Sequence, residues 1–529
     1  MINYNQNQIL NIIEQYTPNF GLSEFLFIYL PDLCIFFGLL FILTILSFNY
    51  YKISNLSLFT LLLKSSQIIF IFIILLLSLS IIITLVDSNS IISLFKTYNI
   101  FNYTYQFNMY TQVFKLIIII TIFILNSFLS FQNIKNCNNI AELLLLIYIV
   151  ITLSFIIISC THYGILLLAL EGFSLSLYIL TTFDRMQGGI TAAVKYFSFG
   201  TLGSIFLFWG VVHIYALIPS LSYNAVFSLS NILLIGIQTN PILESLEFAT
   251  TSILVGFLIK LGAAPTHQWV ADVYTGVNLY VTAVFSTIIK YVIFVIFCRT
   301  AYQLPSTYII EIFAIISLFV GSIITLKQTE IKRFLAYSSI THVGFLLIGD
   351  LNSSFIYIFT YILSSLLFFS VLLSTKNYNK ELIYLSDLRS LKKTNNWSSM
   401  LLVLALASMA GLPPFSGFFG KFLIWGSLIE DILLFNSIYS YTVIIVSILL
   451  TLITIFYYMR LIIYLYSSTD NEIIFNNQIN TEISYSLIKS DSKKYQIQSI
   501  LSFFILFWLV FQSTILGIIT TINQIIILG

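Results

Sequence analysis

Five ionisable side chains lie deep within apolar stretches of this 529-residue sequence: Glu171, Lys195, Lys260, Lys290 and Lys421. A charged group at the centre of a bilayer costs roughly 2.5–3.5 kcal/mol on insertion scales. Burial favours the neutral form of an amine, whereas a nearby carboxylate favours its charged form, so such groups can exchange protons. A single buried lysine could be a structural charge, but five such groups in one chain predict a proton relay.

Two histidines extend this set, because imidazole both accepts and donates protons near neutral pH. His267 follows a proline by two residues, and His342 lies in "AYSSITHVGF" beside the hydroxyl groups of Ser338, Ser339 and Thr341, which could support a water chain. For either histidine alone, a structural hydrogen bond is an equal alternative to a proton role.

Other chemistry finds no support in the sequence. The four cysteines form no metal-binding spacing, and the chain has no phosphate loop, dinucleotide fingerprint, haem or iron–sulfur spacing, or paired nucleophile and base. The net charge of +2 is too small to indicate a nucleic-acid partner. We therefore expect no cofactor, metal or redox site in this chain.

The composition predicts an all-α polytopic membrane protein, since 59% of residues are hydrophobic and 8% are charged, against about 25% charged in soluble domains. Apolar runs of about 20 residues predict about fourteen transmembrane helices. They lie near 25–49, 66–87, 113–131, 141–160, 163–183, 189–217, 243–275, 279–301, 307–326, 331–349, 353–375, 396–430, 437–465 and 498–522.

Two of these runs, 243–275 and 396–430, are too long for one straight span and are interrupted near the middle by "GAAP" and "GLPP". The prolines are Pro265, Pro413 and Pro414. The broken helices are the seventh and twelfth, each fourth in a run of five. Paired Gly/Pro-interrupted helices in corresponding positions point to a transport site between inverted repeats, although two proline kinks in a structural bundle are the alternative.

This pattern predicts four regions. Residues 1–135 form an N-terminal three-helix region, 136–302 the first five-helix repeat (helices 4–8), 303–466 the second (helices 9–13), and 467–529 a loop with a C-terminal helix.

Loop charges predict the orientation. Fourteen basic residues follow odd-numbered helices, and only Lys96 and Arg299 follow even-numbered ones. Both termini should therefore face the positive side of the membrane, and the 376–393 loop the negative side. Lys64, Lys115 and Arg460 lie near helix ends, where long side chains are expected to reach water.

Five motifs together resemble one family: "EGFSLSLYIL", "AAVKYFSFG", "KLGAAPTHQWVADVY", "IKRFLAYSSITHVGF" and "MAGLPPFSGFFGKF". The chain resembles, over roughly helices 4–13, the antiporter-like membrane subunits of NADH:ubiquinone oxidoreductase (respiratory complex I), which are related to multisubunit cation/proton antiporters. The "KY" and "ADVY" motifs and a lysine at 421 favour the branch called chain 2 in mitochondria and subunit N in bacteria. Ala271 and residues 277–280 depart from the family pattern. The loops 88–112 and 466–497 show no recognisable motif of the family.

The resemblance implies a proton-translocating subunit of an NADH:ubiquinone reductase, with flavin, iron–sulfur clusters and quinone site in other subunits. Protons would load Lys260 from the matrix, pass Lys290 and His342, and leave from Lys421 to the intermembrane space. Glu171 and Lys195, on consecutive antiparallel helices, could form a switchable ion pair.

The implied partners are membrane lipid and other membrane-arm subunits, notably chain 4 and the chain 4L/6 region, in the mitochondrial inner membrane. Two alternatives remain: a subunit of a multisubunit cation/proton antiporter, and a structural membrane-arm subunit.

Overall fold

The computed structural model describes most of the chain. Residues 376–382, which carry part of the positive charge of the 376–393 loop, lie outside the described residues, as does most of the 466–497 loop. The described residues are 22–49, 55–86, 98–100, 104–129, 140–183, 187–226, 228, 241–301, 307–375, 383–389, 391, 395–435, 438–467, 492–508 and 516–517.

The predicted all-α polytopic fold is confirmed, and the predicted apolar runs overlap described helices, although most of 509–522 lies outside the described residues. The first part of the chain forms α2 (Leu22–Asn49), α3 (Asn55–Val86), α4 (Met109–Ser127), α5 (Ile140–Ser159), α6 (Tyr163–Thr181), α7 (Gln187–Leu217), α9 (Pro241–Leu261), α10 (Gln268–Gly276), α11 (Leu279–Val284), the π-helix η4 (Phe285–Ile289) and α12 (Lys290–Ala301). Helices are the expected form, because a backbone in lipid must satisfy its own hydrogen bonds.

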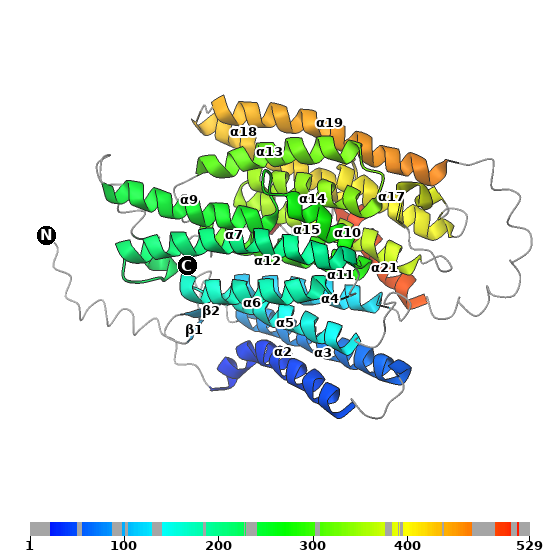
Figure 1. The fold of residues 1–529 in the computed structure, drawn as a ribbon, viewed down its shortest axis with the longest axis horizontal. Coiled ribbons are helices and arrows are strands. Elements are labelled where there is room, and N and C mark those ends of the chain that lie inside the picture. The colour runs from blue at the N-terminus through cyan, green and yellow to red at the C-terminus, as the bar shows by residue number, and fades with distance from the viewer. Residues whose placement is uncertain are drawn as a thin grey trace, which may run out of the picture.

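The second part forms α13 (Thr307–Leu326), α14 (Ile331–Ile348), α15 (Leu351–Ser374), the 3-10 helix η5 (Leu385–Leu388), α17 (Asn396–Ala410), α18 (Ser416–Phe435), α19 (Ile438–Tyr466) and α21 (Ser492–Leu506). Figure 1 shows one bundle of roughly parallel helices, with α2 and α3 at one edge and α18 and α19 at the opposite edge. A short hairpin, β1 (Tyr98–Ile100) and β2 (Tyr105–Phe107), lies at one end of the bundle, in a loop for which the sequence predicted no structure.

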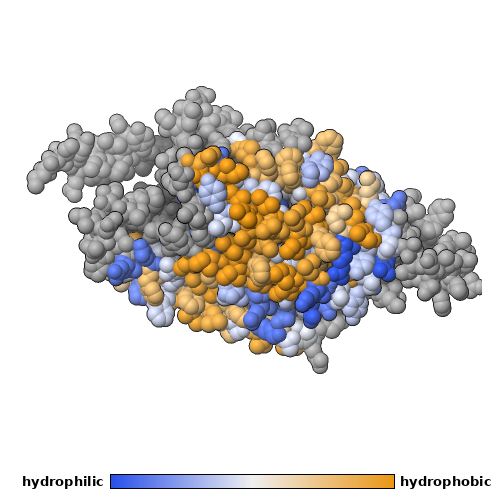
Figure 2. All heavy atoms as spheres, turned by 90° about the horizontal axis from the view of Figure 1, so that it is seen from above, coloured by the Kyte–Doolittle hydropathy of each residue, from blue (hydrophilic) through white to orange (hydrophobic). Residues whose placement is uncertain are grey.

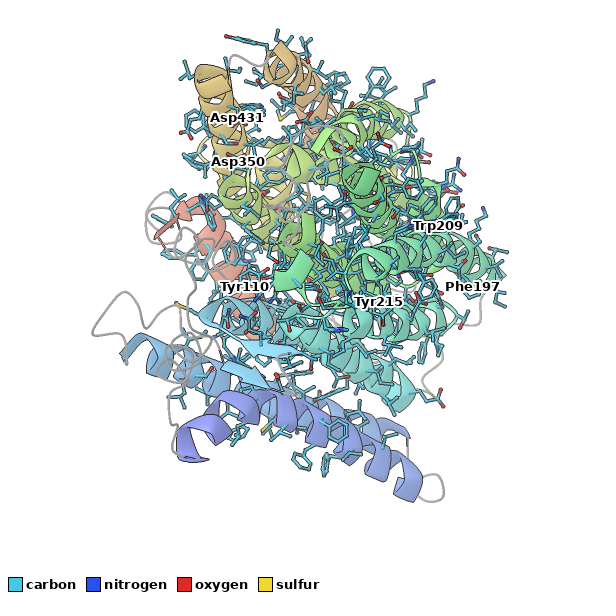
Figure 3. The ribbon with its side chains drawn as sticks, turned by 90° about the vertical axis from the view of Figure 1, so that its left-hand side faces the viewer. Tyr110, Phe197, Trp209, Tyr215, Asp350 and Asp431 are labelled. Atoms are coloured by element: carbon cyan, nitrogen blue, oxygen red, sulfur yellow. The ribbon has the colours of Figure 1, made fainter. Side chains whose placement is uncertain are left out.

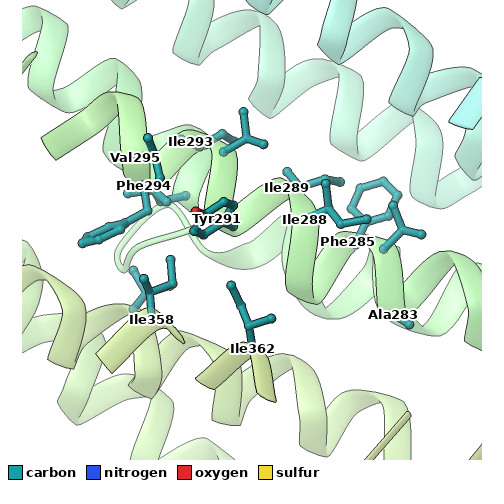
Figure 4. Close-up of a cluster of buried hydrophobic side chains, with 14 of the residues drawn as sticks. Ala283, Phe285, Ile288, Ile289, Tyr291, Ile293, Phe294, Val295, Ile358 and Ile362 are labelled. Carbon is teal, nitrogen blue, oxygen red and sulfur yellow. The ribbon is translucent and has the colours of Figure 1, made fainter. Parts of the chain in front are cut away.

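The continuous helix α11–η4–α12 forms the centre of the bundle. Residues 280–300 are all buried, and Figure 4 shows apolar side chains of this helix facing Ile358 and Ile362 of α15. The outside of the bundle is apolar as well: exposed side chains on α7 and α19 include Phe208, Trp209 and Phe456, and Figure 2 shows a broad hydrophobic face. An apolar exterior and a buried central helix are what a polytopic membrane protein requires.

The predicted break in the seventh helix is confirmed between α9 and α10. Gly262 has φ +74°, the left-handed conformation that glycine adopts without steric cost. Its N–H donates to the carbonyl of Ile259 at 3.1 Å, and the N–H of Ala263 donates to that of Leu258 at 3.0 Å. This is the Schellman pattern that ends helices. The peptide bond before Pro265 is cis.

The break in the twelfth helix, between α17 and α18, repeats this geometry. Gly411 has φ +81°, its N–H donates to the carbonyl of Ser408 at 3.0 Å, and the N–H of Leu412 donates to that of Ala407 at 3.1 Å. The peptide bond before Pro414 is again cis. The likeness between "GAAP" and "GLPP" therefore extends to backbone conformation and hydrogen bonding.

The prediction that Lys115 reaches water was wrong. Its side chain is fully buried, and its Nζ lies 2.8 Å from a carboxylate oxygen of Asp32 on α2. The ring of Phe107 lies 4.4 Å from Nζ, and the hydroxyl of Tyr105 donates to Asp32 at 3.0 Å. The charge is satisfied inside the protein because the hairpin and α2 cover this end of α4.

Candidate functional site

Lys260 lies in the last turn of α9, one residue before that helix ends, and only 9% of it is exposed. Beside it is a cavity of about 20 Å³, lined partly by Ser174, Tyr178 and Tyr196, which offers room for about one water molecule. Glu171 on α6 acts electrostatically on this amine. The structure thus gives Lys260 a hydratable, polar setting next to the first helix break.

Lys290 is the first residue of α12, directly after the π-helix segment of the central helix. It is buried, and its Nζ donates to the backbone carbonyl of Ser339 on α14 at 3.1 Å. This contact joins a helix of the first predicted repeat to a helix of the second. Single-turn π segments often occur at functional sites.

Lys421 lies in α18, one and a half turns after the second break, and 2% of it is exposed. Its Nζ donates to the carbonyl of Ala410 at 2.8 Å and to the hydroxyl of Thr454 at 3.3 Å, and the ring of Phe345 lies 5.1 Å away. The break supplies this acceptor because Ala410 is the last residue of α17 and its carbonyl has no continuing helix. All the contacts are with neutral groups.

His342 connects three helices. Its Nδ1 lies 2.7 Å from the hydroxyl of Tyr357 on α15, and its Nε2 lies 3.1 Å from the hydroxyl of Tyr458 on α19. Two cavities of about 10 Å³ each border this ring, both also bordered by Tyr361. A ring with both nitrogens bound to hydroxyl groups can accept a proton on one side and release one on the other.

The water chain that the hydroxyl groups beside His342 could support stays a prediction. Ser338, Ser339 and Thr341 each donate to a carbonyl one turn earlier in their own helix. The side chains that contact the ring are tyrosines, which the sequence reasoning missed. The signal available was their position in apolar helices, where a buried phenol needs a polar partner.

His267 is only partly buried and lies at the start of α10. Its Nδ1 contacts the carbonyl oxygen of Pro265 at 3.1 Å, and its ring lies 6.3 Å from that of Tyr337. The prolines at both breaks, Pro265, Pro413 and Pro414, are exposed. The structure therefore separates His267 from the buried group around His342.

Lys195 does not form its ion pair with Glu171, as the sequence suggested it could, but with Asp272. Nζ of Lys195 on α7 lies 2.6 Å from Oδ2 of Asp272 on α10, and these side chains are 56% and 39% exposed. Packing of α10 against α7 brings the two residues together, although 77 positions separate them.

A polar seam leads from Tyr357 to the end of the bundle between α15 and α18. The helices approach closely where Gly420 packs against Tyr357, and farther along the hydroxyl groups of Ser353 and Ser427 lie 3.3 Å apart. At its end lie Asp350 and Asp431, which Figure 3 shows as neighbours.

Asp350 occupies the turn between α14 and α15, at the end of this seam. Burial, followed by the negative charges of Asp431 and Glu430, raises the pKa of Asp350 to about 6. A carboxyl group with such a pKa can bind and release protons near neutral pH. The seam thus has Tyr357, a partner of the buried histidine, at one end and a titratable surface group at the other, a feature that the sequence reasoning missed.

Comparison with known proteins bears on the family and the fold. Residues 161–454 match the family described as "NADH:quinone oxidoreductase/Mrp antiporter, TM". The chain is similar to NADH-quinone oxidoreductase subunit N from Pelagibacter ubique, with 31% identity over 383 residues that cover 70% of this chain and 75% of the relative. It is also similar to the subunit of the same name from Ruthia magnifica, with 32% identity over 61% of this chain and 68% of the relative.

Two solved structures share the fold. A chain of respiratory complex I from Thermus thermophilus superposes with a TM-score of 0.69 at 23% identity, over 92% of this chain and 98% of that one. A chain of the membrane-bound sulfane sulfur reductase, an archaeal respiratory membrane complex, superposes with a TM-score of 0.75 at 18% identity, over 96% of this chain and 98% of that one.

Proposed function

This chain belongs to the NADH:quinone oxidoreductase/Mrp antiporter family of membrane subunits, and on that basis we propose that it is a proton-translocating, antiporter-like subunit in the membrane arm of an NADH:quinone oxidoreductase. It is a multi-pass membrane protein. The subunit N relatives support the assignment to such an oxidoreductase over a cation/proton antiporter. The observation that carries proton transfer is that two buried amines, Lys290 and Lys421, are hydrogen-bonded to neutral groups.

The chemistry of those amines suits reversible protonation. The hydrogen-bond acceptors of Lys290 and Lys421 among the described residues are carbonyl and hydroxyl oxygens. An amine held this way can lose its proton without leaving an unpaired buried carboxylate, whose cost would be several kcal/mol. Neither amine is tied to one charge state, unlike Lys115 in its buried ion pair.

The proposed path runs through both predicted repeats, 136–302 and 303–466. A proton loads Lys260 through the water-sized cavity, moves to Lys290, and crosses to the second repeat at the Lys290–Ser339 contact. His342 passes it between tyrosine hydroxyl groups to the neighbourhood of Lys421. Release follows the seam between α15 and α18 to Asp350.

The direction of transfer follows from the loop charges. The side bearing the basic loops is the negative side by the positive-inside rule, which makes it the side of proton uptake. Both termini and Asp350 then lie on the positive side, where protons are released. We place this membrane in the mitochondrion, because an AT-rich organellar genome would favour the frequent Ile, Phe, Asn and Tyr of this sequence; the named relatives are bacterial.

Partner subunits supply the energy and the cofactors in this proposal. Flavin, iron–sulfur clusters and the quinone site belong to other subunits, and no redox step is assigned to this chain. The Lys195–Asp272 pair lies exposed on α7 and α10 among apolar side chains such as Val194 and Phe197. Because exposed charge facing lipid is costly, we assign this face to a neighbouring membrane-arm subunit, such as the chain 4 or chain 4L/6 neighbours.

Two variants of Lys260 test proton transfer in the reconstituted complex. Lys260→Met cannot titrate, and Lys260→Arg cannot release its proton, since guanidinium stays protonated. Both should lose NADH-driven proton transport when it is normalised to assembled complex. Normal transport in the Met variant would rule out a carrier role, and normal transport in the Arg variant alone would make Lys260 a fixed charge.

The assignment to an NADH:quinone oxidoreductase has its own test. Affinity purification of the tagged chain should recover subunits that carry flavin and iron–sulfur clusters, visible in absorption and electron paramagnetic resonance spectra. Recovery of membrane subunits alone would instead favour a multisubunit cation/proton antiporter.

A further inference from the structure

Two ends of the bundle, the first buried and the second partly exposed, share an arrangement that the proton path does not use. We define the first end cluster as residues 158–163, residues 221–223 and Arg299. In it the backbone of 161–163, at the start of α6, pairs antiparallel with 221–223 through hydrogen bonds of 2.9 and 3.0 Å. The β1–β2 hairpin covers this cluster, since the N–H of Thr161 donates to the carbonyl of Thr104.

Arg299, near the end of α12, fills the first end cluster. Only 7% of it is exposed. Its guanidinium donates to the carbonyls of Ile158 and Cys160 at 3.0 Å each and to the side-chain oxygen of Gln106 at 2.5 Å, and it lies 5.3 Å from the ring centre of Tyr223. All these partners are neutral, so the group is a buried positive charge.

The second end cluster, which we define as residues 326–331, residues 383–385 and Arg460, repeats this arrangement. Residues 329–331, at the start of α14, pair antiparallel with 383–385 through two hydrogen bonds of 2.9 Å. Arg460, near the end of α19, donates to the carbonyl of Leu326 at 2.7 Å and lies 5.4 Å from the ring centre of Tyr464.

The two clusters share a layout. One segment keeps a constant offset, since 168 residues separate both Ile158 from Leu326 and His162 from Glu330. The strand partners Ser222 and Tyr384 lie 162 residues apart. They lie at opposite ends of the bundle. The hairpin that covers the first is at the left of Figure 1, and the C-terminal end of α19 is at the right.

Each arginine also lies on the same helix as a buried lysine or as a hydrogen-bond partner of one. Arg299 follows Lys290 by nine residues in α12, about 13 Å along the helix. Arg460 follows Thr454, the hydroxyl partner of Lys421, by six residues in α19, about 9 Å. Among the described residues, no carboxylate forms an ion pair with either arginine. Neutral donors could satisfy the same carbonyls, so the charge itself calls for an explanation.

We propose that Arg299 and Arg460 are fixed positive charges that close opposite ends of the two repeats to protons and other cations, so that a proton entering through one repeat leaves only through the other. Guanidinium suits this role because it does not deprotonate in proteins, and a positive group in a narrow pathway repels cations. This inference rests on the proposed proton transfer and explains why the path must cross at the Lys290–Ser339 contact.

The test is passive proton conductance of the intact complex in liposomes, without NADH, under a potassium diffusion potential. Arg299→Gln keeps donor groups but removes the charge, and it should raise conductance roughly tenfold, the factor given by two unit charges about 10 Å apart at an effective dielectric constant near 20. Arg299→Lys is the matched control and should stay close to the parent. Arg460→Gln should also raise the passive proton conductance. If Arg299→Gln does not assemble, the conductance of Arg460→Gln tests the proposal.

Double variants show which repeat conducts. Lys290→Met should abolish the leak of Arg299→Gln but leave that of Arg460→Gln, whereas Lys421→Met should do the reverse. Assembled complexes in which neither glutamine variant leaks, or in which Arg299→Lys leaks as much as Arg299→Gln, would overturn the proposal. If Lys260→Met still abolishes transport in that case, proton transfer stands and the arginines are structural. Normal transport in Lys260→Met would instead reject the underlying function.

Discussion

The two helix breaks have the same backbone conformation, but the side chains at equivalent positions differ. Both begin with a left-handed glycine and end in a cis proline, yet the residue seven positions after that proline is Asp272 in one and Lys421 in the other. Asp272 is partly exposed and paired with Lys195, whereas Lys421 is buried among neutral groups. One scaffold thus holds an ion pair at the lateral surface and a titratable amine in the interior.

The lysine of the first break takes another position, because Lys260 precedes Gly262 whereas Lys421 follows Gly411. A broken helix leaves carbonyls free on one side and N–H groups free on the other. Lys421 uses such a carbonyl directly, that of Ala410, and Lys260 borders a cavity instead. The comparison teaches that backbone symmetry does not impose symmetric chemistry.

The largest effect should come from removing the buried amine of the second break. Lys421→Met should reduce NADH-driven proton transport to near background, because no described neighbour at that position can replace the amine. Proton uptake per NADH in liposomes, normalised to assembled complex, measures this. Asp272→Asn at the equivalent position of the first break should retain most transport, and equal losses in the two variants would erase the proposed contrast.

The glycines should be needed at both breaks for the same reason. Gly262→Ala and Gly411→Ala force a side chain into a left-handed conformation, which costs roughly 1–2 kcal/mol. Thermal unfolding of the purified complex and the yield of assembly should both fall.

The two alanine variants should differ in transport. The new methyl of Gly411→Ala would lie 2.9 Å from the side chain of Lys421, so it should also displace that amine, whereas that of Gly262→Ala would meet Val270. Per assembled complex, transport should therefore fall more in Gly411→Ala. The reverse order would mean that the first break positions the more sensitive group.

The outlet beside the second break should depend on pH. The pKa of Asp350 is raised to about 6 by burial and by Asp431 and Glu430, so at pH 7 the carboxyl group is mostly ionised and can accept a proton. As the outer pH falls through about 6 it becomes protonated, and release should slow. Asp350→Asn should transport more slowly at pH 7 and lose this dependence, and an unchanged profile would place the outlet elsewhere.

The smallest effect should come from the exposed ion pair of the first break. Exposed pairs contribute about 0–1 kcal/mol to stability, so Asp272→Asn should change the thermal unfolding of the purified complex little. It should instead weaken association with the neighbouring subunit, visible as dissociation at lower detergent or higher salt concentration. Glu171→Gln is the matched control. Because Lys195 pairs with Asp272 and not with Glu171, this variant should leave the association unchanged. Equal dissociation in both variants would contradict the assignment of Asp272 as the partner of Lys195.

Several features could be predicted from sequence because they are local. A run of apolar residues must be long enough to cross the bilayer, and glycine and proline end helices through their own backbone, so the spans and both breaks were found. The burial of Lys290 and Lys421 was also predicted, since each lies deep within an apolar run. The hairpin at 98–107 was missed because two three-residue strands give no periodic signal.

The sequence by itself determined where the helices and their breaks lie and which charges enter the membrane, because hydrophobic length and backbone preference act within one segment. Only the tertiary structure decided which partner each charge has. Asp272 for Lys195, Asp32 for Lys115 and the tyrosines for His342 depend on the rotation and packing of helices that meet 15 to 116 positions apart. A rotation of one residue, about 100° in an α-helix, would turn each of these side chains toward a different neighbour.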